Sequence, residues 1–268
     1  MKKIIFEKIH YELGNDFFDI ANPANVNNGI LRYRNLEAAK SLGLDGINKS
    51  NWCKYFCNFD ALEKNDVPPL VLKYHGHQFG VYNSDIGDGR GFLLAQIRDI
   101  KTNKILDLGT KGSGRTLYSR DGDGKLTLKG AYREILATEM LSALNVPTSQ
   151  TFSVIETKEM LFRNDEPSPA RSAILIRLLN SHIRIGTFQR LSFLGQRDNL
   201  EKLLRHVIEH HYIEIDFKKN IEELIPIFLH EFMKRVADMV SGWMVSGFVH
   251  GVMNTDNFNI TGESFDFG

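Results

Sequence analysis

The stretch that decides the fold reads H-G-V-M-N-T-D-N-F-N-I-T-G-E-S-F-D-F-G and runs from residue 250 to residue 268. Asp256, Asn257 and Asp266 place two carboxylates and one amide oxygen on this short segment. Hard oxygen ligands of this kind suit a Mg²⁺ or Mn²⁺ ion that carries a nucleotide phosphate. A polar turn is the alternative, because Asn, Thr, Asp and Gly all favour turns. The D-F-G at the end of the segment favours the metal site.

Protein kinases use a similar arrangement, in which a catalytic loop ends in Asn and the Asp of a D-F-G binds metal. The kinase pattern has its catalytic base five residues before that Asn, and here the position holds Val252. Valine cannot accept a proton, and the carboxylate nearest to Asn257 on the loop is Asp256. The segment therefore predicts a kinase-type metal site that lacks the usual phosphotransfer base.

Composition and charge are those of an ordinary globular protein. The chain has 268 residues, 42% of them hydrophobic, and its 33 basic and 33 acidic residues give no net charge. The balanced charge therefore gives no indication that the protein binds nucleic acid. Cys53 and Cys57 are too few for a zinc site or a disulfide framework, which favours a reducing compartment.

Glu7 and Lys8 interrupt a stretch at the amino terminus that otherwise begins like a signal peptide. The apolar stretch 239–253 is too short to cross a membrane, so we expect a buried helix there and a cytoplasmic protein.

The periodicity of apolar residues predicts an α+β fold. We expect strands at 70–74, 92–97, 104–108, 151–156 and 173–178, and helices at 129–144, 198–211 and 221–248. Strands that are followed by helices and then by the metal loop give the order of a protein kinase, here a pseudokinase. We expect an N-terminal extension over residues 1–70 that packs on the N-lobe. A β-rich, nucleotide-binding N-lobe would follow over 71–180, and a partial, mostly helical C-lobe over 181–268.

Two glycine-rich turns are candidates for phosphate binding. In G-D-G-R-G, Gly87 and Gly89 let backbone N–H groups approach phosphate oxygens, and Arg90 adds charge-assisted hydrogen bonds. In Y-S-R-D-G-D-G-K, Asp123 and Gly124 are placed to touch a nucleotide. Simple hairpin turns are the alternative, and each motif taken alone favours that alternative.

Four charged residues extend the candidate site. Lys111 follows a predicted strand, and Glu134 lies on the first turns of a predicted helix, as in the Lys–Glu ion pair of kinases. Arg177 interrupts an apolar strand, where it needs a carboxylate or a phosphate partner, and Arg184 follows seven residues later. The alternative for Lys111 and Glu134 is a location on the surface. The alternative for the two arginines is a structural ion pair.

The histidines are expected to be mostly structural. His75 and His77 have no third ligand near them in the sequence, so a metal site is disfavoured. His250 is expected to bond to backbone near the metal loop. His210 and His211, at a helix end, are expected to lie on the surface or to serve packing.

Several short motifs run in order through residues 70–268: G-H-Q-F-G (76–80), G-D-G-R-G (87–91), K-G-S-G-R-T-L-Y-S-R (111–120), D-G-K (123–125), R-E-I-L-A-T-E-M (133–140), S-H-I-R-I-G-T-F (181–188) and H-G-V-M-N-T-D-N (250–257). With them the chain resembles the selenoprotein O (SelO, also YdiU) family of protein adenylyltransferases. That resemblance implies a kinase-like fold that binds ATP in an inverted orientation. It implies transfer of AMP to Ser, Thr or Tyr hydroxyls of protein substrates, with release of pyrophosphate.

The resemblance also implies a role for each candidate residue. Asp256 would accept the proton, Glu134 would orient Lys111, and Mg²⁺ or Mn²⁺ would be held by Asn257 and Asp266. The nucleotide would be contacted by Gly87, Gly89, Arg90, Lys111, Asp123, Gly124, Arg177, Arg184 and Asp266.

Members of that family continue well beyond the D-F-G, so the resemblance implies a chain truncated after this motif. We therefore expect Phe265 and Phe267 to lie exposed, and we consider a separate chain as the source of the missing lobe. An inactive nucleotide-binding pseudoenzyme is one alternative function. A small-molecule phosphotransferase of the aminoglycoside-kinase type is another, although Val252 counts against it because those enzymes need Asp there.

Overall fold

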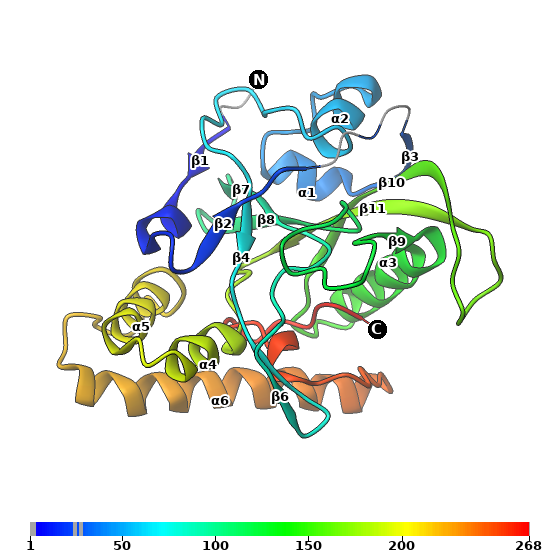
Figure 1. The fold of residues 1–268 in the computed structure, drawn as a ribbon. Coiled ribbons are helices and arrows are strands. Elements are labelled where there is room, and N and C mark those ends of the chain that lie inside the picture. Colours follow the sequence, from blue (N-terminus) through cyan, green and yellow to red (C-terminus); the bar gives the residue numbers. More distant parts are fainter. Residues whose placement is uncertain (1–3, 24–25, 27–28, 268) are drawn as a thin grey trace.

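The fold is α+β, with one large sheet and helices packed around it (Figure 1). It is taken from a computed structural model that describes residues 4–23, 26 and 29–267. Gly268, the last letter of the D-F-G, and Met1 to Lys3, at the start of the predicted extension, therefore lie outside the described residues.

Across the described residues, nine antiparallel strands form the large sheet, in which the order is β2-β4-β7-β8-β11-β10-β3, with β1 beside β7 and β9 beside β11. Their bounds are Phe6–Glu7 (β1), Phe18–Ile20 (β2), Ile30–Arg34 (β3), Leu70–Leu72 (β4), Leu93–Arg98 (β7), Ile105–Lys111 (β8), Leu126–Thr127 (β9), Gln150–Leu161 (β10) and Ala170–Leu179 (β11). A separate hairpin consists of β5 (Gly76–Gln78) and β6 (Val81–Asn83).

The helices α4, α5 and α6 form the lower part of the molecule in Figure 1, whereas α1 and α2 lie at its top. Their bounds are Ile9–Leu13 (η1, a 3-10 helix), Leu36–Ser41 (α1), Lys49–Phe56 (α2), Leu128–Ala143 (α3), Ile185–Phe193 (α4), Arg197–His211 (α5), Ile221–Ser246 (α6) and Thr255–Asn257 (η2, a 3-10 helix). All five predicted strands and all three predicted helices are present. Their ends differ by at most three residues, except that β10 continues five residues beyond the predicted strand.

The first part of the chain supplies three strands of the sheet. β1 pairs with β7, β2 with β4, and β3 with β10, so β2 and β3 lie at the two ends of the strand order. Arg32 on β3 bonds to the Glu156 carboxylate on β10 at 2.6 Å. The predicted division into an extension and two lobes stays a prediction.

Two apolar clusters connect the sheet to the helices. In the first, the rings of Trp52 and Phe56 on α2 pack on Phe152 of β10, and the Trp52 indole N–H donates to Ser153 Oγ at 2.8 Å. The second joins β2 and β4 to α4, α5 and α6. There the Tyr212 hydroxyl donates to the Ile260 carbonyl at 2.8 Å, which holds the middle of the C-terminal segment against the end of α5.

Two expectations about the end of the chain are wrong. Phe265 and Phe267 are only 2% and 7% exposed, because the guanidinium groups of two arginines lie over Phe265 and because Phe267 packs on Phe248 and His250. The C-terminal half of α6 is not a buried helix either. It presents one face to the core and the opposite face to solvent.

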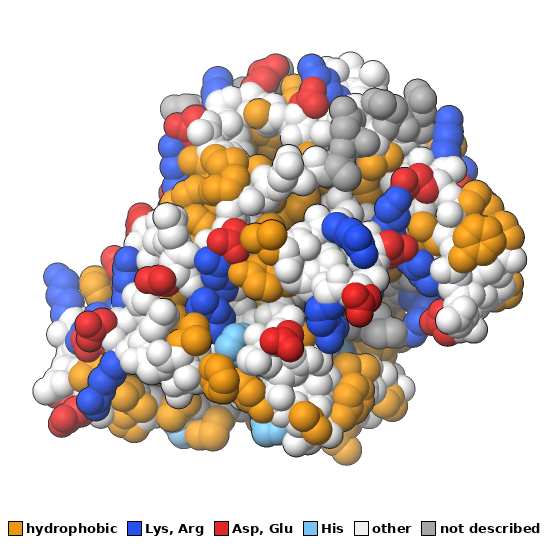
Figure 2. All heavy atoms as spheres, viewed as in Figure 1, with side chains coloured by type: hydrophobic (Ala, Val, Ile, Leu, Met, Phe, Trp, Pro, Cys, Tyr) orange, Lys and Arg blue, Asp and Glu red, His pale blue; other side chains and the backbone are white. Residues whose placement is uncertain are grey.

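The exposed face of α6 carries apolar side chains among its polar ones. Met244 and Val245 are 79% and 90% exposed, and orange side chains gather along the lower edge of Figure 2, over α6. No helix among the described residues combines the length and the hydrophobicity needed to cross a bilayer.

Candidate active site

The sequence-predicted residues converge on one cavity of about 720 Å³ between the sheet and the C-terminal segment. All of them except Lys111 and Glu134 line it: Gly87, Gly89, Arg90, Asp123, Gly124, Arg177, Arg184, Asp256, Asn257 and Asp266. Val252, which stands where kinases have their base, also lines it.

Lys111 and Glu134 form a buried ion pair directly behind this cavity. Lys111 ends β8, Glu134 lies on α3, and the Lys111 ammonium lies 2.5 Å from the Glu134 carboxylate. Their side chains are 3% and 2% exposed. The same ammonium also contacts the Asp266 carboxylate, so Lys111 links α3 to the D-F-G segment.

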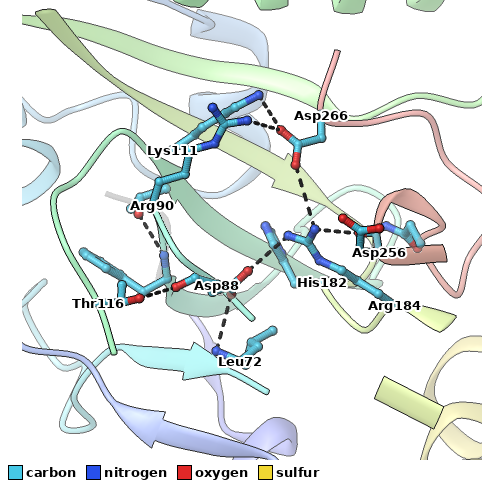
Figure 3. A network of polar contacts seen from close by, with 12 residues as sticks. Leu72, Asp88, Arg90, Lys111, Thr116, His182, Arg184, Asp256 and Asp266 are labelled. Carbon is cyan, nitrogen blue, oxygen red and sulfur yellow. Dashed lines mark hydrogen bonds and ion pairs between the residues drawn. The ribbon is translucent and has the colours of Figure 1, made fainter. Parts of the chain in front are cut away.

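Asp266 is surrounded by positive charge. Besides Lys111, its carboxylate lies 3.4 Å from Arg90 and 3.8 Å from Arg184 (Figure 3). It also lies 3.7 Å from Arg177. Burial would raise the pKa of Asp266, but these four cations outweigh it and hold the pKa well below the usual value. Asp266 also has a φ of 60°, a strained conformation for a non-glycine residue, which is typical of functional sites.

Arg184 joins the first glycine-rich turn to the metal loop. Its guanidinium donates to the Asp256 carbonyl at 2.7 Å and lies 3.1 Å from the Asp88 carboxylate (Figure 3). Tyr74 lies under it, 4.3 Å from the guanidinium to the ring centre. Burial would lower the pKa of Arg184, but Tyr74, Asp88, Asp266 and Asp256 together raise it. Arg184 therefore stays charged while it is buried.

The loop of residues 250–257 presents oxygen atoms of the kind that hold a divalent cation. Gln78 donates to Asp256 Oδ2 at 2.9 Å, whereas Asp256 Oδ1 is buried and has no hydrogen-bond partner among the described residues. The Asn257 amide nitrogen donates to the Val252 carbonyl at 2.9 Å, so its amide oxygen is the atom left for a cation. These oxygen atoms and the Asp266 carboxylate fit the hard ligand set of Mg²⁺ or Mn²⁺.

His250 supports the loop from behind. Its Nε2 lies 2.9 Å from the Phe265 carbonyl oxygen, which confirms the expected bond to backbone. Its ring also stacks on Trp243 of α6, with ring centres 5.1 Å apart. His250 therefore positions the segment that carries Asp266.

The two glycine-rich turns pack against each other. A Cβ atom on Gly89 would lie 2.6 Å from the Tyr118 carbonyl oxygen, and Thr116 donates to the Asp88 carbonyl at 2.5 Å. Glycine at position 89 is therefore required by the close approach of the two turns, whether or not a phosphate binds there.

Two residues that line the cavity, Arg163 and Asp88, were not among those predicted from the sequence. Arg163 forms a bidentate pair with Asp123, at 2.9 and 3.0 Å, and lines the cavity. Asp88 is the partner of Arg184. Asp88 could have been found, because it lies inside G-D-G-R-G and an acidic residue there is an evident partner for a basic one. Nothing in the sequence around Arg163 indicates its role, since it lies 40 residues from Asp123.

Comparisons with known proteins show which family the chain resembles. A family described as "Protein adenylyltransferase SelO" matches residues 1–268. Two proteins named "Protein nucleotidyltransferase YdiU", from Trichormus variabilis and Synechocystis sp., are 47% and 45% identical to the chain. The alignments cover 98% and 99% of this chain but 53% and 55% of the relatives. A protein of the same name from Hahella chejuensis is 35% identical over 100% of this chain and 53% of its own length. The chain thus spans about half the length of these relatives.

Proposed function

Because the chain belongs to the SelO family of protein adenylyltransferases, we propose that its cavity binds ATP and that it transfers AMP to Ser, Thr or Tyr hydroxyls of proteins. The single observation that carries the proposal is the convergence of Arg90, Arg177 and Arg184 with the oxygen atoms of Asp256 and Asp266 on one cavity. Its volume of about 720 Å³ lies within the usual range for a small-molecule site.

The cations of the site match the charge of a triphosphate. Arg177 has two buried guanidinium nitrogens, Nε and Nη1, that have no hydrogen-bond partner among the described residues. Phosphate oxygens would supply those partners and offset the cost of burying the charge. The turns that contain Gly87, Gly89, Asp123 and Gly124 lie along the same cavity and would enclose the phosphates.

The proposed reaction is an in-line displacement at the α-phosphorus. The hydroxyl oxygen of a protein side chain forms a bond to this phosphorus, the bond to the bridging oxygen breaks, and pyrophosphate leaves. The Asp256 carboxylate accepts the hydroxyl proton or positions the hydroxyl. Arg177 and Arg184 neutralise negative charge on the phosphate oxygens. A divalent ion held by Asn257 and Asp266 would supply further charge neutralisation.

We also propose a kinase-like fold for this chain. The strands β4 to β11, followed by the helices α4 to α6, support a kinase-like arrangement with a β-rich lobe before a helical one. A cytoplasmic location and Mg²⁺ or Mn²⁺ as the ion stay predictions.

A nucleotide-binding pseudoenzyme is the second candidate. It is favoured by one observation, that Val252, which cannot accept a proton, stands in the cavity where kinases have their base. A kinase-type phosphotransferase has less support, since Val252 lines the cavity at the position of the kinase base.

Labelled ATP separates these functions. The protein is incubated with Mg²⁺ and with ATP that carries the label at either the α- or the γ-phosphate. AMP transfer predicts α-label on protein, which is lost in Asp256→Asn and retained in the control Asp85→Asn, where the exposed carboxylate lies outside the cavity. Transfer of γ-label would refute the proposal in favour of a kinase. Bound ATP without transfer of either label would identify a pseudoenzyme.

A further inference from the structure

A second cluster of metal-binding side chains lies away from the candidate active site, where η1 packs on α5 (Figure 1). It consists of Glu12 on η1 and of His206 and His210 on α5. One ligand atom from each of these three residues lies within 4.8 Å of the other two. None of the three lines the active-site cavity.

The helix brings the two histidines together. Residues four apart lie on the same face of an α-helix, and here the ring centres of His206 and His210 are 4.6 Å apart. Glu12 approaches from the other element, with its carboxylate 3.9 Å from His210 Nε2. Two histidines from one helix and a carboxylate from elsewhere form a donor set that is common in zinc sites.

Each of the two imidazoles has one ring nitrogen without a hydrogen-bond partner among the described residues. The Nε2 atoms of His206 and His210 are buried and have no hydrogen-bond partner among the described residues. His206 is only 7% exposed. A buried polar atom without a partner is costly, and an ion or a water is the usual explanation. Burial lowers the pKa of His206, which favours the neutral imidazole, the form that binds metal.

We propose that Glu12, His206 and His210 bind a divalent transition-metal ion of the Zn²⁺ class. Bonds of ~2.1 Å to a tetrahedral ion place the ligand atoms ~3.4 Å apart, so the cluster closes by ~1 Å on binding. The exposed Glu12 side chain can make that movement. Imidazole ligands favour Zn²⁺ over Mg²⁺. The ion would tie η1, next to the first strands of the sheet, to the helical part of the molecule.

The test uses the purified protein after treatment with EDTA and dialysis, titrated with Zn²⁺ in a calorimeter. We expect uptake of one ion at this cluster and a rise in Tm with Zn²⁺ concentration. Loss of one ligand in Glu12→Gln or His210→Ala is expected to weaken this binding by at least ~100-fold, since loss of a mere hydrogen-bond partner of a ligand already costs ~10–100-fold. The control His230→Ala removes an exposed histidine of α6 and is expected to bind like the wild type.

A further variant keeps the two metal sites distinguishable. Asp266→Asn removes a predicted ligand of the nucleotide-site ion, and Zn²⁺ uptake at the η1–α5 cluster is expected to persist in it. Circular dichroism checks that each variant is folded. Equal Zn²⁺ affinity in folded His210→Ala and wild type would overturn the proposal, as would failure of the folded wild type to take up Zn²⁺.

Discussion

Replacement of Glu134 by Gln tests the electrostatic centre of the site. Gln keeps the size of the side chain and an acceptor oxygen but removes the negative charge that faces Lys111, 2.5 Å away. Loss of one partner from a buried ion pair costs ~3–5 kcal/mol when the other charge is left alone. Here Lys111 keeps a contact with Asp266, so its charge stays compensated. We therefore expect a loss of ~1.5–3 kcal/mol, the usual contribution of a hydrogen bond to a charged group.

The same substitution is expected to weaken nucleotide binding. With Glu134 neutral, Asp266 is the remaining carboxylate on Lys111, and the ammonium then competes more strongly with a divalent ion for that carboxylate. We expect the affinity for ATP in the presence of Mg²⁺ to fall about tenfold, which corresponds to ~1.4 kcal/mol. Binding in the absence of Mg²⁺ is expected to change less.

Urea unfolding followed by circular dichroism measures the first effect, and calorimetric titration with ATP measures the second. Glu139→Gln is the matched control, because Glu139 lies on the exposed face of the same helix and bonds only to the Tyr33 hydroxyl among the described contacts. It is expected to change stability by less than ~0.5 kcal/mol. An unfolding midpoint for Glu134→Gln equal to that of the wild type would show that the pair does not hold α3 to β8.

Three further outcomes follow from the site. Gly89→Ala is expected to cost ~1–3 kcal/mol in urea unfolding because its Cβ would meet the Tyr118 carbonyl oxygen, whereas Gly46→Ala, with open space around its Cβ, should be neutral or slightly stabilising; equal effects would contradict the packing of the turns. The lowered pKa of Asp266 means that its contribution to stability is complete above the ordinary value of ~3.9 and is lost as the pH falls below it. Asp266→Asn should therefore flatten the acid limb of a plot of unfolding free energy against pH, and an unchanged limb would argue against the four-cation cluster. Asn257→Ala should abolish the gain in ATP affinity that Mg²⁺ provides, measured by calorimetry, and a full gain in this variant would rule out Asn257 as a ligand.

Regular elements with a clear period were predictable from the sequence. The helix over 129–144 and the strand pair at 151–156 and 173–178 bury apolar faces whose spacing is visible in the residues alone. The three short strands before residue 35 carry no such period, because two to five residues cannot display one. Their pairing depends on partners far along the chain, which a local pattern does not contain.

The residues that line the cavity were predictable because most of them lie in short sequence motifs. The ion pairs and hydrogen bonds that these residues form were not predictable. Asp88 and Arg163 acquire their partners only when turns from different parts of the chain meet. The expected exposure of Phe265 failed for the same reason, since the arginines that cover it come from β11 and the segment before α4. His206 and His210 did show a readable spacing, but the third ligand, Glu12, lies on a distant element.

The placement of β3 at one end of the sheet has a consequence during synthesis. Arg32 on this strand and its partner Glu156 are 124 residues apart. At a translation rate of ~5–20 residues per second, roughly 6 to 25 s pass before the ribosome delivers that partner. Through this interval the nascent strand presents unpaired backbone groups, which invite association with other chains. Expression at lower temperature with abundant chaperones, and placement of affinity tags away from the amino terminus, should therefore raise the yield of folded protein.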